Sequence, residues 1–575
     1  MTAKPFTPTA EQARIICHSG SAFVAACPGS GKTRVLVERA RKLLTNRQLG
    51  SGVAFLSFTI AAVSELEGRL RYEGLLQNTV FPHFIGTFDS FLWQFLIAPF
   101  GVPGCSARPR LIPDKDERPI QPFPAAQALP LQCFDRTTGA AIPDELIRYR
   151  FRGKIKAHET AARNTRARFL ERGELDFEDA RAIALERLRD PTSSPVLAGA
   201  LAARFQELVV DEAQDCNPFD LEIINWFRAA SIPVKVICDP NQAIYGFRGG
   251  VADELIAFGK SFDESERLPV TGNFRSSHNI TMAIGSLRAP NARSAGDEAL
   301  GEYRDEPSPV FVLAYPGNSV PASIGVKFSE LTEALGLNAR QCPVVAATRL
   351  SGANALGHPT DNGVKELSCR LAVAVSNYHF SFELGGRKDA LEAVHKVMLE
   401  LTGEVVNKTY HQYLVDAGIE PSSWRPRVLE LADDLRFDPE RFSSADAWLD
   451  YARRILAPLL QADGRSISQR LRRNVDLAKA LACAPASGHS SQTIHSVKGM
   501  EFPAVCVVMS SRRAKGIIQL LTAGGSHSSG EDARKIYVGA SRAQRLLAIA
   551  VPKSQAARLV SLLRGTGAAV SLVAL

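Results

Sequence analysis

Short apolar runs bounded by turn residues recur along the chain, and stretches with helical periodicity separate several of them. A first set of runs comprises Ala22–Ala26, Val53–Phe58, Phe84–Ile85, Leu208–Val210, Val234–Cys238 and Leu268–Thr271. A second set comprises Val310–Ala314, Pro343–Thr348, Ser491–Ile494, Ala504–Met509 and Leu546–Val551. Buried strands of parallel sheets read as near-continuous apolar runs that alternate with helices. The pattern therefore predicts an α/β protein with two parallel-sheet cores.

Two mainly helical insertions are expected to interrupt these cores. Pro-rich residues 109–130 and Gly- and Asn-rich residues 351–363 are typical of boundaries rather than of element interiors. The expected division is a first core at residues 1–100 and 201–267 around an insertion at 101–200, and a second core at 268–350 and 481–575 around an insertion at 351–480. A length of 575 residues agrees with several domains.

The distribution of charge says more than the net charge of +8, which is too mild by itself to establish nucleic-acid binding. Nine basic residues against only Glu159 and Glu171 lie between residues 148 and 172. They are Arg148, Arg150, Arg152, Lys154, Lys156, Arg163, Arg166, Arg168 and Arg172. The segment predicts either a surface that follows a phosphate backbone or a solvated helix face.

Cysteine usage and hydropathy narrow the class of protein. The ten cysteines occur singly, with no pair at metal-ligand spacing and no disulfide-like framework. The N-terminus lacks a signal-peptide pattern, and no apolar stretch approaches the roughly 20 residues of a membrane span. We therefore expect a cytoplasmic protein with no membrane partner and no structural zinc or iron–sulfur cluster.

Residues 26–33 have the pattern of a phosphate-binding loop between a strand and a helix. The loop reads Ala26, Cys27, Pro28, Gly29, Ser30, Gly31, Lys32 and Thr33. In such a loop backbone N–H groups point at phosphates, the lysine reaches the β and γ oxygens, and the threonine hydroxyl holds Mg²⁺. The general pattern has glycine where this chain has Ala26, which a less sharply kinked loop accepts. ATP and Mg²⁺ are thus the predicted cofactors.

Two carboxylates follow the apolar run that ends at Val210. Asp211 can hold Mg²⁺ together with Thr33, and Glu212 can orient or deprotonate an attacking water. An isolated Asp-Glu pair at a strand end is usually solvated surface. The upstream phosphate loop favours a hydrolytic site instead.

The ordered motifs resemble those of superfamily 1A DNA helicases of the UvrD/Rep/PcrA type. The resemblance extends over Phe6–Ala543, although the two insertions match poorly. The matching segments are Thr9–Gln12, the phosphate loop, Phe58–Thr59, Gly86–Asp89, Asp211–Asp215, Asp239–Arg248, Asn273–Ser276, Thr493–Phe502 and Tyr537–Ala543. It implies two RecA-like lobes that close on ATP, and 3′ to 5′ movement on single-stranded or tailed duplex DNA.

The same resemblance assigns roles around the nucleotide. Gln12 would recognise adenine and Phe274 would stack on it; the alternatives are an ordinary helix residue and a core aromatic. Arg275 and Arg542 are the candidate arginine fingers, whose planar charged forks can stabilise charge on the γ-phosphate. The remaining positions are Gln242 as the γ-phosphate sensor, Arg34 beside the phosphates, and Gly499 and Glu501 on the ribose side.

A motor on single-stranded DNA needs aromatic faces for bases and polar groups for phosphates. By resemblance the aromatic faces are Phe58, Phe88, Tyr245 and Phe247, with core packing as the alternative for each. The polar contacts are Thr59, Thr87, His495 and Ser496, and His495 could instead be a buried structural histidine.

Three positions depart from the family pattern. Ile60 and Ala61 stand where the family has Asn and Lys, and Asp89 stands where it has His. An anion at Asp89 is expected to repel phosphate and weaken the grip on DNA.

Three interpretations of the biological role follow from the resemblance. The first is an autonomous helicase or translocase, and repair or recombination housekeeping is a third that shares its chemistry and differs only in partners. The second, motivated by the altered DNA motifs and the short second insertion, is a nucleotide- and DNA-sensing subunit that controls a partner nuclease in antiviral defence. Such an arrangement is similar to the Gabija anti-phage systems, whose UvrD-like subunit pairs with an OLD-family nuclease.

Overall fold

The computed structural model describes residues 6–44, 51–76, 80–113, 115–244, 252–293, 296–357, 366–384, 387–404, 410, 413–414, 417–460, 466–481, 488–524 and 530–575. The chain divides into two compact units, Met1–Phe274 and Arg275–Leu575. The division falls after Phe274 rather than at the expected position 267, because the strand at 267–270 pairs within the first unit.

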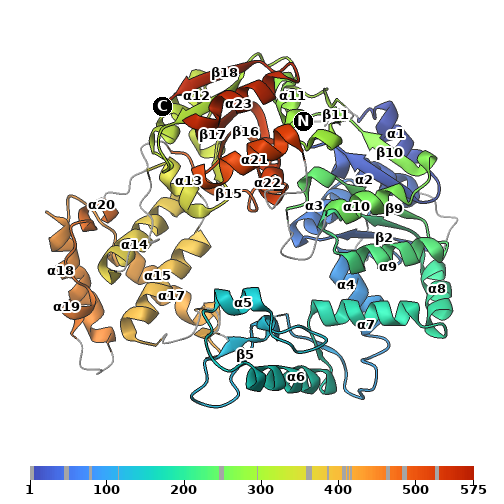
Figure 1. Ribbon diagram of the computed structural model, residues 1–575, viewed down its shortest axis with the longest axis horizontal. Coiled ribbons are helices and arrows are strands. Elements are labelled where there is room, and N and C mark those ends of the chain that lie inside the picture. The colour runs from blue at the N-terminus through green and yellow to red at the C-terminus, as the bar shows by residue number, and fades with distance from the viewer. Residues whose placement is uncertain are drawn as a thin grey trace. The chain divides into compact units, whose positions relative to one another are not determined.

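The first unit is built on a six-stranded, wholly parallel sheet in the order β10-β1-β9-β8-β2-β3 (Figure 1). The strands are β1 Ala22–Ala26, β2 Gly52–Ser57, β3 Phe84–Thr87, β8 Phe205–Val210, β9 Val234–Cys238 and β10 Arg267–Val270. Each overlaps one of the predicted apolar runs, and β1 and β9 match theirs residue for residue. The α/β prediction is confirmed for this unit.

Successive residues of each strand pack on opposite faces of this sheet. On β2, Phe55 points to the face covered by α1 (Ala10–Cys17), α2 (Lys32–Leu44) and α3 (Ile60–Tyr72). Leu56 points to the face covered by α4 (Phe88–Leu92), α7 (Phe177–Arg189), α8 (Ser193–Arg204) and α9 (Pro218–Ala229). The carboxyl ends of β1 and β8 therefore sit between two packed helical layers, where the phosphate loop and the two carboxylates emerge.

A buried ion pair joins α2 to β8 in this unit. Arg39 of α2 makes two hydrogen bonds to the carboxylate of Glu207 on β8, and its Nη1 donates to the carbonyl oxygens of Ile15 and Ile16 at 2.9 and 3.0 Å. Lys235 of β9 lies 3.7 Å from the same carboxylate and is fully buried. The contacts fix α1 against α2 and the sheet.

The insertion of the first unit is less helical than the sequence predicts. Its first half contains short strands and turns: β4 Arg110–Leu111, η2 Lys115–Glu117, β5 Pro119–Ile120, β6 Leu129–Pro130 and η3 Leu131–Cys133. Helices α5 (Pro143–Arg148) and α6 (Lys156–Glu171) follow, and β7 (Glu174–Leu175) pairs with β4 before α7 begins. Prolines at 109, 113, 119, 122, 124 and 130 remove backbone donors there, which disfavours helix.

The second unit contains another six-stranded parallel sheet, in the order β15-β14-β16-β17-β13-β18. The strands are β13 Val310–Tyr315, β14 Val344–Ala346, β15 Ser491–Thr493, β16 Phe502–Val508, β17 Ala543–Pro552 and β18 Val570–Ala574. Helices α11 (His278–Ser286), α12 (Ser323–Ala334), α13 (Arg349–Ala355), α21 (Ser511–Ala523), α22 (Gly530–Ala540) and α23 (Lys553–Arg564) accompany the sheet. The sequence analysis missed only the edge strand β18 of this sheet.

A helical insertion with its own apolar core interrupts the second unit. Its main helices are α14 (Leu367–Leu384), α15 (Arg387–Thr402), α17 (Pro421–Asp434), α18 (Ala445–Leu456), α19 (Ile467–Arg470) and α20 (Leu477–Leu481). Trp448, fully buried, belongs to this core and donates from its indole to the carbonyl oxygen of Leu435 at 2.7 Å. Among the described residues, no helix is long and apolar enough to cross a membrane.

Candidate functional site

The phosphate loop lies between β1 and α2 and is held from three sides. The amide of Cys27 donates to Val270 at 2.9 Å, and the carbonyl oxygen of Gly29 accepts from the amide of Phe274 at 2.8 Å. Gly31 has φ +73°, and a Cβ there would meet Nε2 of Gln12 at 3.4 Å. A side chain is thus disfavoured at Gly31 by its backbone conformation, while the space there would accept a Cβ. The loop has the rigidity and the open backbone that phosphate binding needs.

Gln12 is buried against this loop. Its Nε2 donates to the carbonyl oxygen of Ser30 at 2.9 Å, and its Oε1 accepts from the amide of Thr9 at 3.0 Å. The second bond is half of a capping box that begins α1. In this conformation the amide of Gln12 braces the loop, and its contact with adenine stays a prediction.

Lys32, Thr33 and Arg34 form the first turn of α2 and are half-buried. The guanidinium carbon of Arg34 lies 4.9 Å from the centre of the Phe6 ring, and its buried Nε has no hydrogen-bond partner in the described part of the chain. A charged donor left open beside the phosphate loop suits an anionic ligand.

The two carboxylates stand directly after β8. The amide of Asp211 donates to Leu56 at 2.8 Å, which continues the sheet by one residue. Burial first, and then the neighbouring charge of Glu212, raise the pKa of Asp211 to about 7, while Lys32 opposes the shift. No ion pair to Asp211 occurs among the described residues. A half-buried carboxylate without a cation partner fits Mg²⁺, which takes few protein ligands beside phosphate oxygens.

A hydrogen-bonded relay runs from the candidate base to the candidate γ-phosphate sensor. Nε2 of Gln214 donates to the Glu212 carboxylate, and Oε1 of Gln214 accepts from the amide of Asp239 at 3.1 Å. Oδ2 of Asp239 then accepts from Nε2 of Gln242 at 2.9 Å. Gln214, Asp239 and Gln242 are at most 4% exposed. The relay fixes the amide of Gln242 and the carboxylate of Glu212 in one buried network.

The sequence analysis quoted Gln214 and Asp239 inside motifs but assigned them no role. The available signal was their chemistry, because a buried amide and a buried carboxylate need partners. The two residues lie on different loops, after β8 and β9, which are neighbours in the sheet. Their pairing follows from the sheet order rather than from the local sequence.

The two candidate arginine fingers converge on Ser541 within the second unit. Nη1 of Arg275 donates to the carbonyl oxygen of Ser541 at 2.9 Å, and its Nε donates to Glu501 at 2.9 Å. Nη2 of Arg542 donates to the hydroxyl of Ser541 at 2.8 Å, and its Nε to the carbonyl oxygen of Val538 at 3.0 Å. Arg542 is 3% exposed. Ser541, which the sequence analysis did not single out, orients both guanidinium groups.

Three of the remaining nucleotide positions are exposed, whereas Pro28 is buried. Phe274 is 38% exposed at the end of the first unit, as a stacking surface requires. Gly499 is exposed in the turn after β15, and the Glu501 carboxylate, 55% exposed, is held by Arg275. Pro28 precedes the two glycines of the loop. Ribose and adenine contacts by these residues stay predictions.

Two of the aromatic rings expected to contact DNA, Phe58 and Phe88, pack against each other, and only Phe58 is partly exposed. Phe58 is half-buried and stacks on Phe88 with ring centres 5.4 Å apart and planes 16° apart. Phe88 is 1% exposed, so in this conformation its ring supports Phe58 from the core and has no free face for a base. Thr59 and Thr87 cap α3 and α4 through hydrogen bonds from Ala62 and Ser90, at 3.2 and 3.1 Å.

The other residues expected to contact DNA are His495, Ser496, Tyr245 and Phe247. His495 is half-buried and Ser496 is exposed, and the Ser496 hydroxyl donates to the carbonyl oxygen of Thr493 at 2.9 Å. Tyr245 and Phe247 lie outside the described residues. Their roles stay predictions.

The expectation that Asp89 repels phosphate stays a prediction, and the structure adds a contact that the sequence analysis did not foresee. The Asp89 carboxylate accepts a hydrogen bond from Nη2 of Arg181, a residue on α7. Arg181, which also contacts Asp220 and Glu178, holds the Asp89 carboxylate from the protein side. No local signal indicates this pairing, because 92 positions separate the two residues.

The basic segment at 148–172 is mostly solvent-exposed. All nine cations except Arg166 are exposed; Arg166 is 7% exposed and lies 3.2 Å from Asp116. Arg148 has only a 3.6 Å contact with Glu145. In the described ranges, Arg150, Arg152, Lys154 and Lys156 have no carboxylate within ion-pair distance. The loop before α6 thus presents uncompensated positive charge.

Two family models match the chain in the expected order. The UvrD/REP helicase N-terminal domain matches residues 8–263, and the UvrD-like helicase C-terminal domain matches residues 491–554. Together they cover more than half of the chain, including both candidate carboxylates and Arg542. The chain belongs to the UvrD-like helicases.

Curated relatives agree with membership of this helicase family. DNA helicase II of Haemophilus influenzae is 26% identical over 307 residues, covering 50% of this chain and 41% of that protein. The ATP-dependent DNA helicase UvrD2 of Mycobacterium bovis is 23% identical over 572 residues, covering 93% of this chain and 77% of that protein. UvrD1 of the same organism is 26% identical over 306 residues, covering 49% and 39%. The chain thus spans about two fifths of some UvrD-like relatives and most of another.

Proposed function

We propose that this chain is an ATP-dependent DNA helicase that moves 3′ to 5′ on single-stranded DNA. The observation that carries the proposal is the buried relay from Glu212 through Gln214 and Asp239 to Gln242, beside a braced phosphate loop. Such a network holds a base and a phosphate-contacting amide in fixed relative positions. The names of the relatives supply the DNA substrate and the coupling to ATP.

In the proposed reaction the phosphate-loop amides and Lys32 bind the β- and γ-phosphates. Thr33 and Asp211 would hold Mg²⁺, which offsets phosphate charge when bound. Glu212 orients the attacking water and accepts its proton, while Gln242 contacts the γ-phosphate. Arg275 and Arg542 stabilise negative charge that develops on the transferred group.

We propose that DNA is held on Phe58, supported from below by Phe88, with phosphate contacts from Thr59 and Thr87. Base stacking on an aromatic ring contributes on the order of 1–3 kcal/mol per base and tolerates any sequence. The exposed cations Arg150, Arg152, Lys154 and Lys156 would bind further phosphates. His495, Ser496, Tyr245 and Phe247 complete the proposed path.

The test measures ATP hydrolysis with and without single-stranded DNA, and strand displacement on 3′-tailed and 5′-tailed duplexes. We expect DNA to stimulate hydrolysis and unwinding to require a 3′ tail. Lys32→Ala is expected to abolish hydrolysis, and Glu212→Gln to abolish hydrolysis while nucleotide binding persists. A Lys32→Ala protein with normal DNA-stimulated hydrolysis would falsify the assignment of the site.

The same experiment separates the second function, in which the chain controls a partner nuclease. Stimulated hydrolysis without unwinding of either tailed duplex favours such a nucleotide- and DNA-sensing subunit. Unwinding by the isolated chain favours the autonomous helicase.

A further inference from the structure

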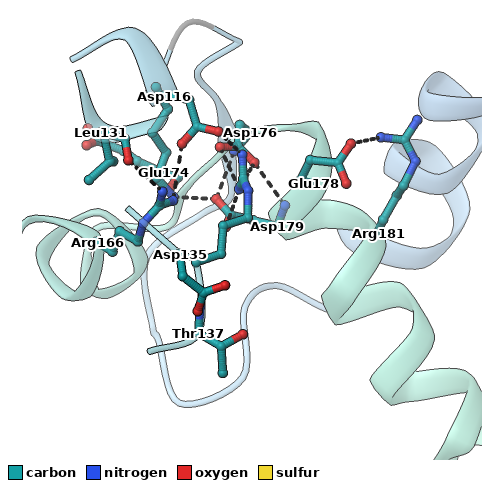
Figure 2. A network of polar contacts seen from close by, with 12 residues as sticks. Asp116, Leu131, Asp135, Thr137, Arg166, Glu174, Asp176, Glu178, Asp179 and Arg181 are labelled. Carbon is teal, nitrogen blue, oxygen red and sulfur yellow. Dashed lines mark hydrogen bonds and ion pairs between the residues drawn. The ribbon is translucent and has the colours of Figure 1, made fainter. Parts of the chain in front are cut away.

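The buried guanidinium of Arg181 contacts carboxylates from three helices of the first unit, α4, α7 and α9. Its Nε donates to Oδ1 of Asp220 at 2.8 Å, its Nη1 to Glu178 at 2.8 Å, and its Nη2 to Asp89. The side chain of Arg181 is 9% exposed and that of Asp220 is 2% exposed. Figure 2 shows the contact with Glu178, which lies on the same helix. The other two carboxylates come from α9 and α4.

Asp220 connects this guanidinium to the segment after the candidate base. The capping box of α9 joins Asp220 to Asn217 through hydrogen bonds of 2.9 and 3.0 Å. Only η4 (Ala213–Asp215) and Cys216 separate that box from Glu212. The start of α9 therefore follows the loop that contains Gln214 and Glu212 with only a short connection between them.

Asp89 connects the same guanidinium to the proposed DNA contacts. It is the second residue of α4, between Phe88, which stacks under Phe58, and Ser90, whose amide is bonded to Thr87. A displacement of Thr87 or Phe88 therefore displaces Asp89.

The helix that carries Arg181 is anchored by a second charge network at its first turn (Figure 2). Asp176 and Asp179 form the capping box of α7 and accept hydrogen bonds from Nη1 of Arg136 at 2.8 to 3.3 Å. Lys115, fully buried, pairs with Asp179, and the carboxylate of Asp116 pairs with Arg136 and lies 3.2 Å from Arg166. Three cations thus meet three carboxylates. The base of α7 is fixed to the insertion.

We propose that Arg181 is a positioning residue that makes hydrolysis at Glu212 respond to DNA at Thr87 and at Phe58, which Phe88 supports. Moving Asp220 alone would leave its buried carboxylate without the guanidinium, which is strongly unfavourable, and moving Asp89 alone would break its hydrogen bond to Arg181. The planar fork of arginine also fixes the direction of both carboxylates. A shift of α4 on DNA binding is therefore passed to the start of α9. This inference rests on the proposed DNA-stimulated hydrolysis.

The decisive variant is Asp89→Asn, which keeps the shape and one acceptor but removes the charge. We expect the DNA-stimulated rate to fall on the order of 2- to 30-fold, the range of coupling changes caused by single substitutions. Basal hydrolysis and the unfolding temperature should stay close to those of the unaltered chain. The matched control is Glu178→Gln, which removes the more exposed carboxylate of the same guanidinium and should leave stimulation unchanged.

A second readout does not depend on hydrolysis. In the unaltered chain, single-stranded DNA should change amide hydrogen exchange at residues 217–221, and Asp89→Asn should abolish that change while DNA still binds. A purely structural role would instead lower basal and stimulated rates together with the unfolding temperature. Either that pattern or unaltered stimulation in Asp89→Asn overturns the proposal.

The outcome also separates this inference from the proposed function. If DNA fails to stimulate hydrolysis by the unaltered chain, the proposed function and the inference fall together. If DNA stimulates both proteins equally, only the inference falls. Tighter DNA binding by Asp89→Asn, with full stimulation, would show that Asp89 acts as a repelling anion and not through Arg181.

Discussion

Gln12 donates a hydrogen bond from Nε2 to the carbonyl oxygen of Ser30 in the phosphate loop, over 2.9 Å. Its Oε1 is engaged at the same time by the amide of Thr9. A side chain expected to recognise a base thus also braces the loop that would bind the phosphates. These two roles make different predictions.

Gln12→Ala removes both hydrogen bonds and is expected to raise KM for ATP by about 2- to 10-fold, the effect of one ordinary hydrogen bond. If Gln12 only braces the loop, KM for GTP rises by the same factor. If it also binds adenine, the preference for ATP over GTP disappears. The measurement is steady-state hydrolysis with both nucleotides. Gln12→Glu is the control, because it keeps an acceptor for Thr9 but offers Ser30 no donor.

Breaking the hydrogen-bonded relay at Gln214 should slow ATP hydrolysis more than it weakens nucleotide binding. Gln214→Met preserves volume but leaves Glu212 without its donor and the amide of Asp239 without its acceptor. We expect kcat to fall between about tenfold and 100-fold, because a small misplacement of a reacting group has effects of that size. Nucleotide affinity, measured with a fluorescent ATP analogue, should change much less. Equal decreases in both quantities would contradict a positioning role.

The basic loop before α6 makes a prediction about salt. Replacing Arg150, Arg152 and Lys154 with Gln should reduce the slope of log affinity against log salt by about 0.7–0.9 for each phosphate that the variant no longer neutralises. The measurement is DNA binding by fluorescence anisotropy between low and moderate salt. The matched control replaces three exposed cations of α23, Lys553, Arg558 and Arg564. If both triple variants behave alike, the segment is a solvated face.

The second insertion should become less stable in acid. Burial lowers the pKa of His395 to about 4 from its ordinary 6.5; the ring stacks on Trp424 at 4.1 Å and contacts the Tyr410 hydroxyl at 2.8 Å. Between these pH values the unfolded chain binds the proton and the folded chain does not. Stability is therefore intact above pH 6.5 and falls as pH drops toward 4, by at most on the order of 3 kcal/mol.

Urea unfolding followed by tryptophan fluorescence at pH 7.5 and 5.0 checks this expectation. His395→Gln should be less stable at pH 7.5 and should show a much smaller difference between the two pH values. An unchanged difference in that variant would show that other groups cause the acid sensitivity.

The buried ion pair between Arg39 of α2 and Glu207 of β8 should be sensitive to single substitutions. Glu207→Gln leaves Arg39 and Lys235 as buried cations facing a neutral amide. We expect a decrease of roughly 3–5 kcal/mol in the free energy of unfolding, the range for breaking a buried pair. Chemical denaturation of the variant measures the decrease. The exposed pair Arg69–Glu65 provides the control, and Glu65→Gln should cost less than about 1 kcal/mol.

Both sheets could be predicted from the sequence because buried strands of parallel sheets are continuous apolar runs. The sequence was insufficient for β18, whose residues are half-buried or exposed at an edge and so lack that signature. The phosphate loop and the carboxylates were visible because their chemistry depends on neighbours in the chain. The contact of Asp89 with Arg181 was not predicted, because 92 positions separate the two residues. The roles of Gln214 and Ser541 also depend on contacts that only the folded chain brings together.

The backbone at Glu212 adopts φ 55° and ψ 35°, a left-handed conformation that disfavours side chains by about 1–2 kcal/mol. Glycine is the residue best suited to that geometry. A redesign of this chain guided by stability alone would therefore choose glycine at position 212. It would return a well-folded protein that lacks its candidate base.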